Sequence, residues 1–121
     1  MGTTKNTFPE NSKIIDIGIF VDSMFYISKG SCKVTITEKE KEILLAILPE
    51  NVFFGEMSFI EDQVTTANVV TAQESEIVSL HRDKLLILFQ RSSYLAIKFF
   101  LNLAQLLAQR YKTVLKQNLG I

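Results

Sequence analysis

The stretch that decides the fold is residues 48–60, Leu-Pro-Glu-Asn-Val-Phe-Phe-Gly-Glu-Met-Ser-Phe-Ile. Pro49, Asn51 and Gly55 are residue types that favour turns. Residues 55–60 have the pattern of one helical turn rather than of a strand. We therefore expect a turn and a short helical segment that interrupt a β-rich region.

On both sides of this stretch, short runs of apolar residues recur at every second position. The clearest run is 32–37, where Cys32 and two further apolar residues alternate with polar ones, which predicts a strand with one buried face. Further β-rich runs lie at 15–21, 43–47, 65–71 and 76–80. Short strands at spacings of about ten residues favour a sandwich or barrel over a parallel βαβ sheet.

After residue 82 the pattern becomes helical. Residues 83–90 predict a short helix that begins near an acidic residue. Ser92 and Ser93 are candidate N-caps for a long helix from residue 94 to about 117, and Gly120 is a stop signal beyond it.

The long helix carries more apolar surface than a single contact requires. One seam steps by 4-3-4-3-4 through Ile97, Leu101, Ala104, Ala108, Tyr111 and Leu115. A second set, broken by Arg110, contains Phe100, Leu103, Leu107 and Val114. One seam is enough to dock a helix on its own domain, whereas a second at heptad spacing favours a homodimer through this helix. A broad stripe facing the core is the alternative.

Composition and charge exclude several classes of protein. The chain has 121 residues, with 13 Lys+Arg against 13 Asp+Glu, so it lacks the basic character of direct nucleic-acid binding. The single cysteine, Cys32, excludes an intrachain disulfide and fits a reducing, cytoplasmic compartment, and the single histidine, His81, argues against a zinc site. No signal peptide or membrane span is expected. We expect a flexible or partly ordered lead-in at 1–12 and one domain at 13–121.

Three blocks of the sequence together resemble the cyclic nucleotide-binding domain family. Residues 48–60 resemble its phosphate-binding cassette, with Phe-Gly-Glu at 54–56, and residues 18–31 resemble its upstream glycine- and Asp-Ser-containing signature. The helical region after residue 82 resembles its lid, most closely in regulators of the cyclic AMP receptor type. The resemblance implies a mainly β protein, a jelly-roll (double-stranded β-helix) barrel followed by a short and a long α-helix.

The resemblance also implies roles for cassette residues. The backbone of Phe54, Gly55 and Met57 would approach the cyclic phosphate of cyclic AMP or cyclic GMP, Glu56 would accept a hydrogen bond from the ribose, and Ser58 would cap the helix or touch phosphate. On the long helix, Thr113 is a candidate for a contact with the base. A dipole-complementing role for Glu56 and a solvated position for Thr113 are the simpler alternatives.

The sequence departs from the family where the phosphate-pairing arginine belongs. Thr65 stands at that position, and Thr66 follows it. A guanidinium makes two charge-assisted hydrogen bonds to a phosphate, whereas a threonine hydroxyl can donate one neutral bond. The loss predicts binding weaker by about 10- to 1,000-fold.

Two functions stay open. The first is a regulatory sensor that couples a cyclic nucleotide at residues 54–67 to movement of the C-terminal helices. The second is a degenerate domain that binds no nucleotide and serves as a dimerisation or protein-interaction module. No nucleophile or metal set accompanies the acidic residues of the cassette, so we expect neither an enzyme nor a metal site.

Overall fold

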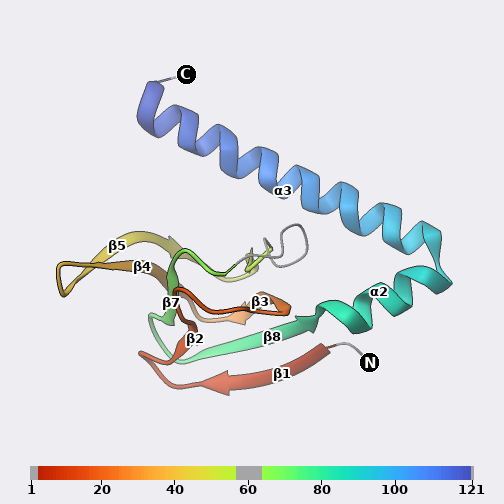
Figure 1. The fold of residues 1–121 in the computed structure, drawn as a ribbon, viewed down its shortest axis with the longest axis horizontal. Helices are drawn as coiled ribbons and strands as arrows, with labels where there is room; N and C mark the ends of the chain where they lie inside the picture. Colours follow the sequence, from red (N-terminus) through yellow and green to blue (C-terminus); the bar gives the residue numbers. More distant parts are fainter. Residues whose placement is uncertain (1–2, 57–63, 121) are drawn as a thin grey trace. The chain divides into compact units, whose positions relative to one another are not determined.

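A computed structural model of the chain describes residues 3–56 and 64–120. The chain divides into two compact units, Met1–Leu85 and Leu86–Ile121, and each is described by itself (Figure 1).

The first unit is built from antiparallel strands in two sheets of four. Within the described residues these are β1 (Thr3–Phe8), β2 (Lys13–Ile15), β3 (Ser23–Lys29), β4 (Cys32–Glu38), β5 (Lys41–Leu48), β6 (Phe53–Phe54), β7 (Asn68–Thr71) and β8 (Ser75–His81). The sheet orders are β1-β8-β3-β6 and β2-β7-β4-β5, so strands distant in sequence lie next to each other (Figure 1). The mainly β architecture predicted from the sequence is confirmed.

The core of this unit joins side chains from both sheets. Ile27 on β3 and Ile77 on β8 are register partners and are 0% and 1% exposed. The apolar positions of the alternating runs supply most of the buried cluster, which contains Ile15, Ile27, Cys32, Phe54, Val69 and Ile77. The predicted burial of Cys32 is therefore confirmed.

Two β segments differ from the sequence-based expectation. The polar start, expected as a lead-in, forms β1, which pairs with β8 from Thr3 to Phe8. This pairing needs main-chain groups rather than apolar side chains, so a polar sequence can supply it. The run at 15–21 contributes only the last residue of β2, because the chain leaves the sheet at Asp16 and Gly18 adopts a φ of +81°.

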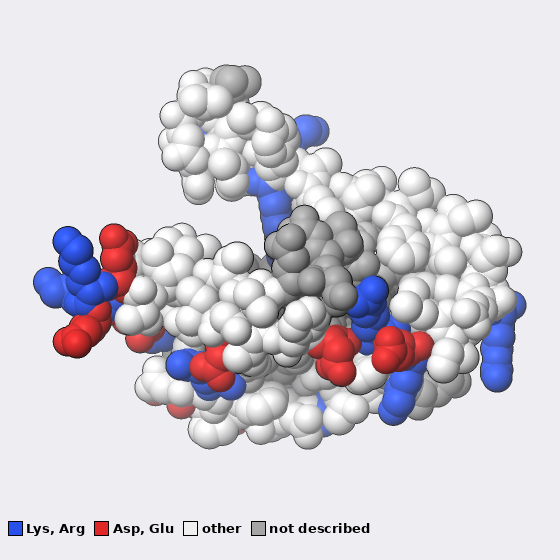
Figure 2. Space-filling view, viewed as in Figure 1, with Lys and Arg blue, Asp and Glu red and all other residues white. Residues whose placement is uncertain are grey.

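The hairpin between β4 and β5 ends in a two-residue turn. Lys39 and Glu40 both have positive φ, 51° and 65°, and Glu38 pairs with Lys41 across the turn. Positive φ at both central residues is the geometry of the tightest hairpin turns. Figure 2 shows charged side chains of both signs gathered at this tip, as expected of a turn in contact with solvent.

Strand β5 is present but is not half-buried. It lies at the edge of its sheet, and Ile43, Leu44, Leu45 and Ile47 are 38%, 56%, 55% and 54% exposed. Both faces of the strand therefore present apolar side chains to solvent.

Two helices follow the strands. Helix α2 (Arg82–Arg91) begins in the first unit, and α3 (Ser93–Leu119) belongs to the second. Ser92 caps α3, because its side chain accepts a hydrogen bond from the Leu95 amide at 3.2 Å, and Gly120 ends it in the left-handed conformation. Both predicted helices, the Ser92 cap and the stop signal are confirmed. Within the described residues, no helix is long and apolar enough to cross a membrane.

Candidate functional site

The cassette begins on strand β6, which anchors it to the core. Phe54 pairs with Phe25 of β3, is 3% exposed, and stacks on the Phe25 ring with centroids 5.2 Å apart. The chain enters β6 through Asn51, whose φ is +65° and whose amide donates to the Ile27 carbonyl at 2.7 Å. Asparagine tolerates this left-handed backbone better than most residues, so the tight turn forms without glycine.

Gly55 follows β6 in a conformation that suits glycine alone. Its φ is +76°, and a β-carbon at this position would stand 3.2 Å from Phe25 Cδ2 and 3.4 Å from the Ser23 carbonyl oxygen. A side chain would meet backbone and ring atoms as well as the strain of a positive φ. Glycine at residue 55 therefore lets the cassette backbone pack closely against β3.

Glu56 follows Gly55 directly and is only 8% exposed. Burial of a carboxylate costs free energy unless partners compensate for it, so Glu56 is not a solvated surface residue. The ribose role implied for Glu56 stays a prediction. The other two predicted residues of the short helical segment, Met57 and Ser58, lie outside the described residues.

Thr65, at the position of the family's arginine, is tied to the chain that follows β2. Its hydroxyl donates to the carbonyl oxygen of Asp16 and accepts from the amide of Ile19 at 3.2 Å. Its amide donates to the Ile19 carbonyl at 2.9 Å, and its carbonyl accepts from the Gly18 amide at 2.8 Å. The single hydrogen of the hydroxyl is thus already engaged with the protein.

Sequence reasoning did not identify Asp16, Ile19 and Asn68 as part of this arrangement. Asn68, which is 5% exposed, accepts a hydrogen bond from the Ile17 amide at 2.9 Å. The sequence signal that could have identified Asn68 is its place as a polar residue at the start of the apolar strand β7. Thr66, the other predicted threonine, is exposed next to Thr65.

The charge along this part of the chain is unfavourable for a phosphate. Residues 42–81 contain no lysine or arginine, and their acidic residues are Glu42, Glu50, Glu56, Glu61, Asp62, Glu74 and Glu76. Any cation that pairs with a ligand phosphate must therefore come from another part of the chain or from a partner.

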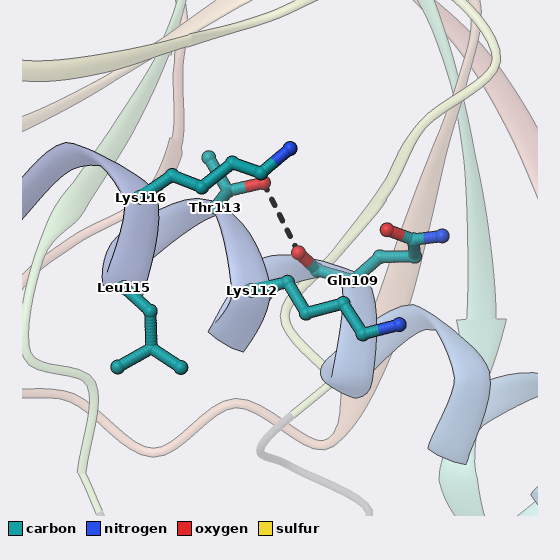
Figure 3. Close-up of a pocket in the computed structure, with 5 residues that line it drawn as sticks. All are labelled: Gln109, Lys112, Thr113, Leu115 and Lys116. Carbon is teal, nitrogen blue, oxygen red and sulfur yellow. Dashed lines mark hydrogen bonds between the residues drawn. The ribbon is translucent and has the colours of Figure 1, made fainter. Parts of the chain in front are cut away.

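Thr113 lies in the other unit, on α3. Its hydroxyl donates to the Gln109 carbonyl at 3.0 Å, one helical turn earlier (Figure 3). It borders a hollow of about 280 Å³ together with Gln109, Lys112, Leu115 and Lys116, all from α3 (Figure 3). The base contact implied for Thr113 stays a prediction.

Neither metal nor thiol chemistry is evident in the described part of the chain. It holds no group of three or more His, Cys, Asp or Glu side chains placed to bind a metal ion. Burial raises the pKa of the Cys32 thiol to about 11, so the thiol is protonated and unreactive near neutral pH. His81, the last residue of β8, lies 3.0 Å from an Asp22 carboxylate oxygen.

A comparison with known protein families identifies the family of this chain. The family described as "Cyclic nucleotide-binding domain" matches residues 5–92. The chain belongs to the cyclic nucleotide-binding domain family. The resemblance of the sequence to that family, and the jelly-roll architecture that it implied, are both confirmed.

Relatives and solved structures agree with this assignment. The chain is 28% identical to the cyclic AMP receptor protein of Thermus thermophilus over 109 residues, which cover 89% of this chain and 49% of that protein. The crystal structure of the Thermus thermophilus catabolite activator protein matches with a TM-score of 0.76 and 26% identity, over 93% of this chain and 51% of that one. A cyclic nucleotide-binding domain from Methylobacillus flagellatus matches with a TM-score of 0.90 and 22% identity, over 98% of this chain and 67% of that one, and shows the fold alone.

The chain spans about half the length of its Thermus relative. The family and its relatives support a regulatory sensor role for this domain.

Proposed function

We propose that this domain is a regulatory sensor that takes a cyclic nucleotide, cyclic AMP or cyclic GMP, at residues 54–67 and couples it to the C-terminal helices. In this proposal the domain is not itself an enzyme, acts in the cytoplasm, and works as a homodimer through α3 without binding nucleic acid directly. Ligand binding would bias a two-state equilibrium of the helices after residue 82.

The single observation that carries this proposal is the match of the cyclic nucleotide-binding domain family to residues 5–92, which include the whole cassette. Within the cassette, Gly55 has a positive φ and packs closely against Phe25 and Ser23, which fixes the backbone that leads into Glu56. Glu56, buried directly after it, adds the acceptor that a ribose hydroxyl would use. These features support a site for a sugar phosphate that approaches the main chain closely.

Isothermal calorimetry of the purified chain with cyclic AMP and with cyclic GMP tests the proposal. Because no lysine or arginine occurs between residues 42 and 81, we expect a dissociation constant about 10- to 1,000-fold weaker than an arginine-containing cassette would have. Glu56→Gln should weaken binding further, since it leaves a less basic acceptor. No heat with either nucleotide at millimolar concentration would contradict the sensor proposal.

The second candidate, a domain that binds no nucleotide, is favoured by the engagement of the Thr65 hydroxyl with Asp16 and Ile19. Two matched variants discriminate between the candidates. Thr65→Arg and Thr66→Arg add the same charge one residue apart, so nonspecific attraction of the nucleotide is equal in both. If the cassette is a working site, Thr65→Arg should bind cyclic AMP at least tenfold more tightly than Thr66→Arg. Equal affinities would favour the non-binding module.

A further inference from the structure

The chain between β2 and β3 is ordered although little of it is buried. Residues 16–20 are all exposed, including Ile17 at 43%, Ile19 at 44% and Phe20 at 63%. Hydrophobic burial therefore does not explain the conformation of residues 16–20, although Val21 after them packs against the core. An exposed segment keeps one conformation only where hydrogen bonds or ion pairs hold it.

An ion pair stands at one end of this segment and a histidine–aspartate contact at the other, and both are solvent-exposed. Lys13 pairs with Asp16 at 3.1 Å, and His81 pairs with Asp22 at 3.0 Å, with the two aspartate side chains 55% and 72% exposed. Ion pairs in such surroundings contribute little to stability, so they do not account for the order of the segment either.

The hydrogen bonds to residues 65 and 68 remain as its main support. Every amide from Ile17 to Ile19 donates to this part of the chain: Ile17 to Asn68 Oδ1, Gly18 to the Thr65 carbonyl, and Ile19 to Thr65 Oγ1. In the opposite direction, Thr65 donates from its amide to Ile19 and from its hydroxyl to Asp16. The side chain of Thr65 thus closes a bridge between segments 49 residues apart in the sequence.

We propose that Thr65 is a positioning residue that clasps residues 16–19 to the exit of the cassette, and that it is not a phosphate donor. A threonine hydroxyl has one hydrogen, and here that hydrogen goes to the Asp16 carbonyl. A phosphate that reached this position would meet the lone pairs of an oxygen rather than a donor. The role concerns the cassette of the proposed function, but it does not require that a nucleotide binds.

The test is residue-resolved amide hydrogen exchange, measured by NMR on the full chain without ligand. Thr65→Val removes the hydroxyl and keeps the shape, so the amide of Ile19 loses its acceptor. We expect its exchange to accelerate about fivefold or more, in keeping with the loss of one hydrogen bond. Thr65→Ser keeps the hydroxyl, and Thr66→Val makes the same change one residue away, so both should exchange at the wild-type rate.

The core amides of Ile27 and Ile77 serve as the reference for global stability. They should exchange at unchanged rates in Thr65→Val while Ile19 accelerates. An unchanged Ile19 rate in Thr65→Val would overturn the proposal. Equal acceleration of Ile19 and the core amides would also overturn it, because Thr65 would then support the whole unit rather than this segment. Both outcomes are independent of the calorimetric test of nucleotide binding.

Discussion

Gly30 lies directly against Ser75. A β-carbon built on Gly30 would stand 2.3 Å from Ser75 Oγ and 2.7 Å from the Glu74 carbonyl oxygen, and the φ of Gly30 is +94°. The Ser75 hydroxyl is held there, since it accepts from the Ser31 amide at 3.2 Å and has two carbonyl oxygens within donating distance, that of Gln73 at 2.8 Å and that of Ser31 at 3.1 Å. Gly30 therefore lets the β3–β4 turn approach the chain that enters β8.

Substitution of this glycine should destabilise the first unit strongly. In Gly30→Ala the new methyl meets backbone atoms in addition to the strain of a positive φ, so we expect a loss of about 3 kcal/mol or more in the free energy of unfolding. Gly18→Ala is the matched control, because Gly18 has a φ of +81° but nothing within 4 Å of its β-carbon position. Its cost should stay near 1 kcal/mol. Urea denaturation followed by circular dichroism measures both, and equal losses would show that strain rather than contact matters at Gly30.

The central strand β3 and the edge strand β5 contribute unequally to the core, which a second pair of variants can show. Ile27→Ala removes a side chain that is 0% exposed, and it should cost about 2–5 kcal/mol. Leu45→Ala on β5 changes a side chain that is 55% exposed, and it should cost about 0.5 kcal/mol or less. A loss above about 2 kcal/mol for Leu45→Ala in the monomer would mean that β5 is covered in solution.

This contrast shows the limit of local sequence patterns. Val34 on β4 and Leu45 on β5 both belong to alternating apolar runs, and both runs were correctly predicted as strands. The pattern does not reveal that β4 lies between two strands and β5 at an edge, because strand order depends on pairing between segments distant in sequence. The caps of α3 could be predicted since Ser92 and Gly120 act on their own neighbours.

In the candidate site, too, the local motif could be predicted from the sequence and the contacts between distant segments could not. Phe54, Gly55 and Glu56 follow one another in the sequence, so their motif could be recognised. The hydrogen bonds of Thr65 with Asp16 and Ile19 could not be predicted, because the pairing of β2 with β7 is what brings these two distant segments together. Substitution of an arginine by threonine indicates a lost cation, but the residue identity alone does not tell where the remaining hydroxyl hydrogen goes.

The thiol of Cys32 gives a pH-dependent prediction. Burial raises its pKa from 9.0 to about 11, so the folded state keeps the proton over a range in which the unfolded chain has lost it. The unfolded state then binds fewer protons, and the stability that the neutral thiol contributes falls as the pH rises from about 9 to 11. The difference in unfolding free energy between wild type and Cys32→Ala should be constant below pH 8. Above pH 9 it should shift against the wild type by no more than about 2–3 kcal/mol.

Chemical denaturation at several pH values measures this difference. Lysines and tyrosines titrate in the same pH range in both proteins. Their contribution to the unfolding free energy therefore cancels in the difference between wild type and Cys32→Ala. As an independent check, a thiol reagent such as iodoacetamide should label Cys32 at pH 8 only after unfolding. Rapid labelling of the folded protein would contradict the burial of the thiol.

The exposed seam of α3 tests the proposed homodimer. Ile97, Leu101 and Tyr111 lie on this seam and are 62%, 61% and 64% exposed, while Ala104 and Ala108 between them are small enough to let two helices approach closely. We expect the wild-type chain to sediment as a dimer at micromolar concentrations. Leu101→Glu should weaken the dimer at least about a hundredfold, because each copy would bury an unpaired carboxylate in the contact.

The matched control is Asn102→Glu, which adds the same charge to the same turn of α3 but off the seam. Residues 101 and 102 are both exposed in the chain, so neither variant should alter the helical circular dichroism signal or the stability of the monomer. Analytical ultracentrifugation across a concentration series should then show dissociation for Leu101→Glu alone. A monomeric wild type would contradict a dimer through α3, and equal weakening by both variants would show that net charge, rather than burial of the seam, controls association.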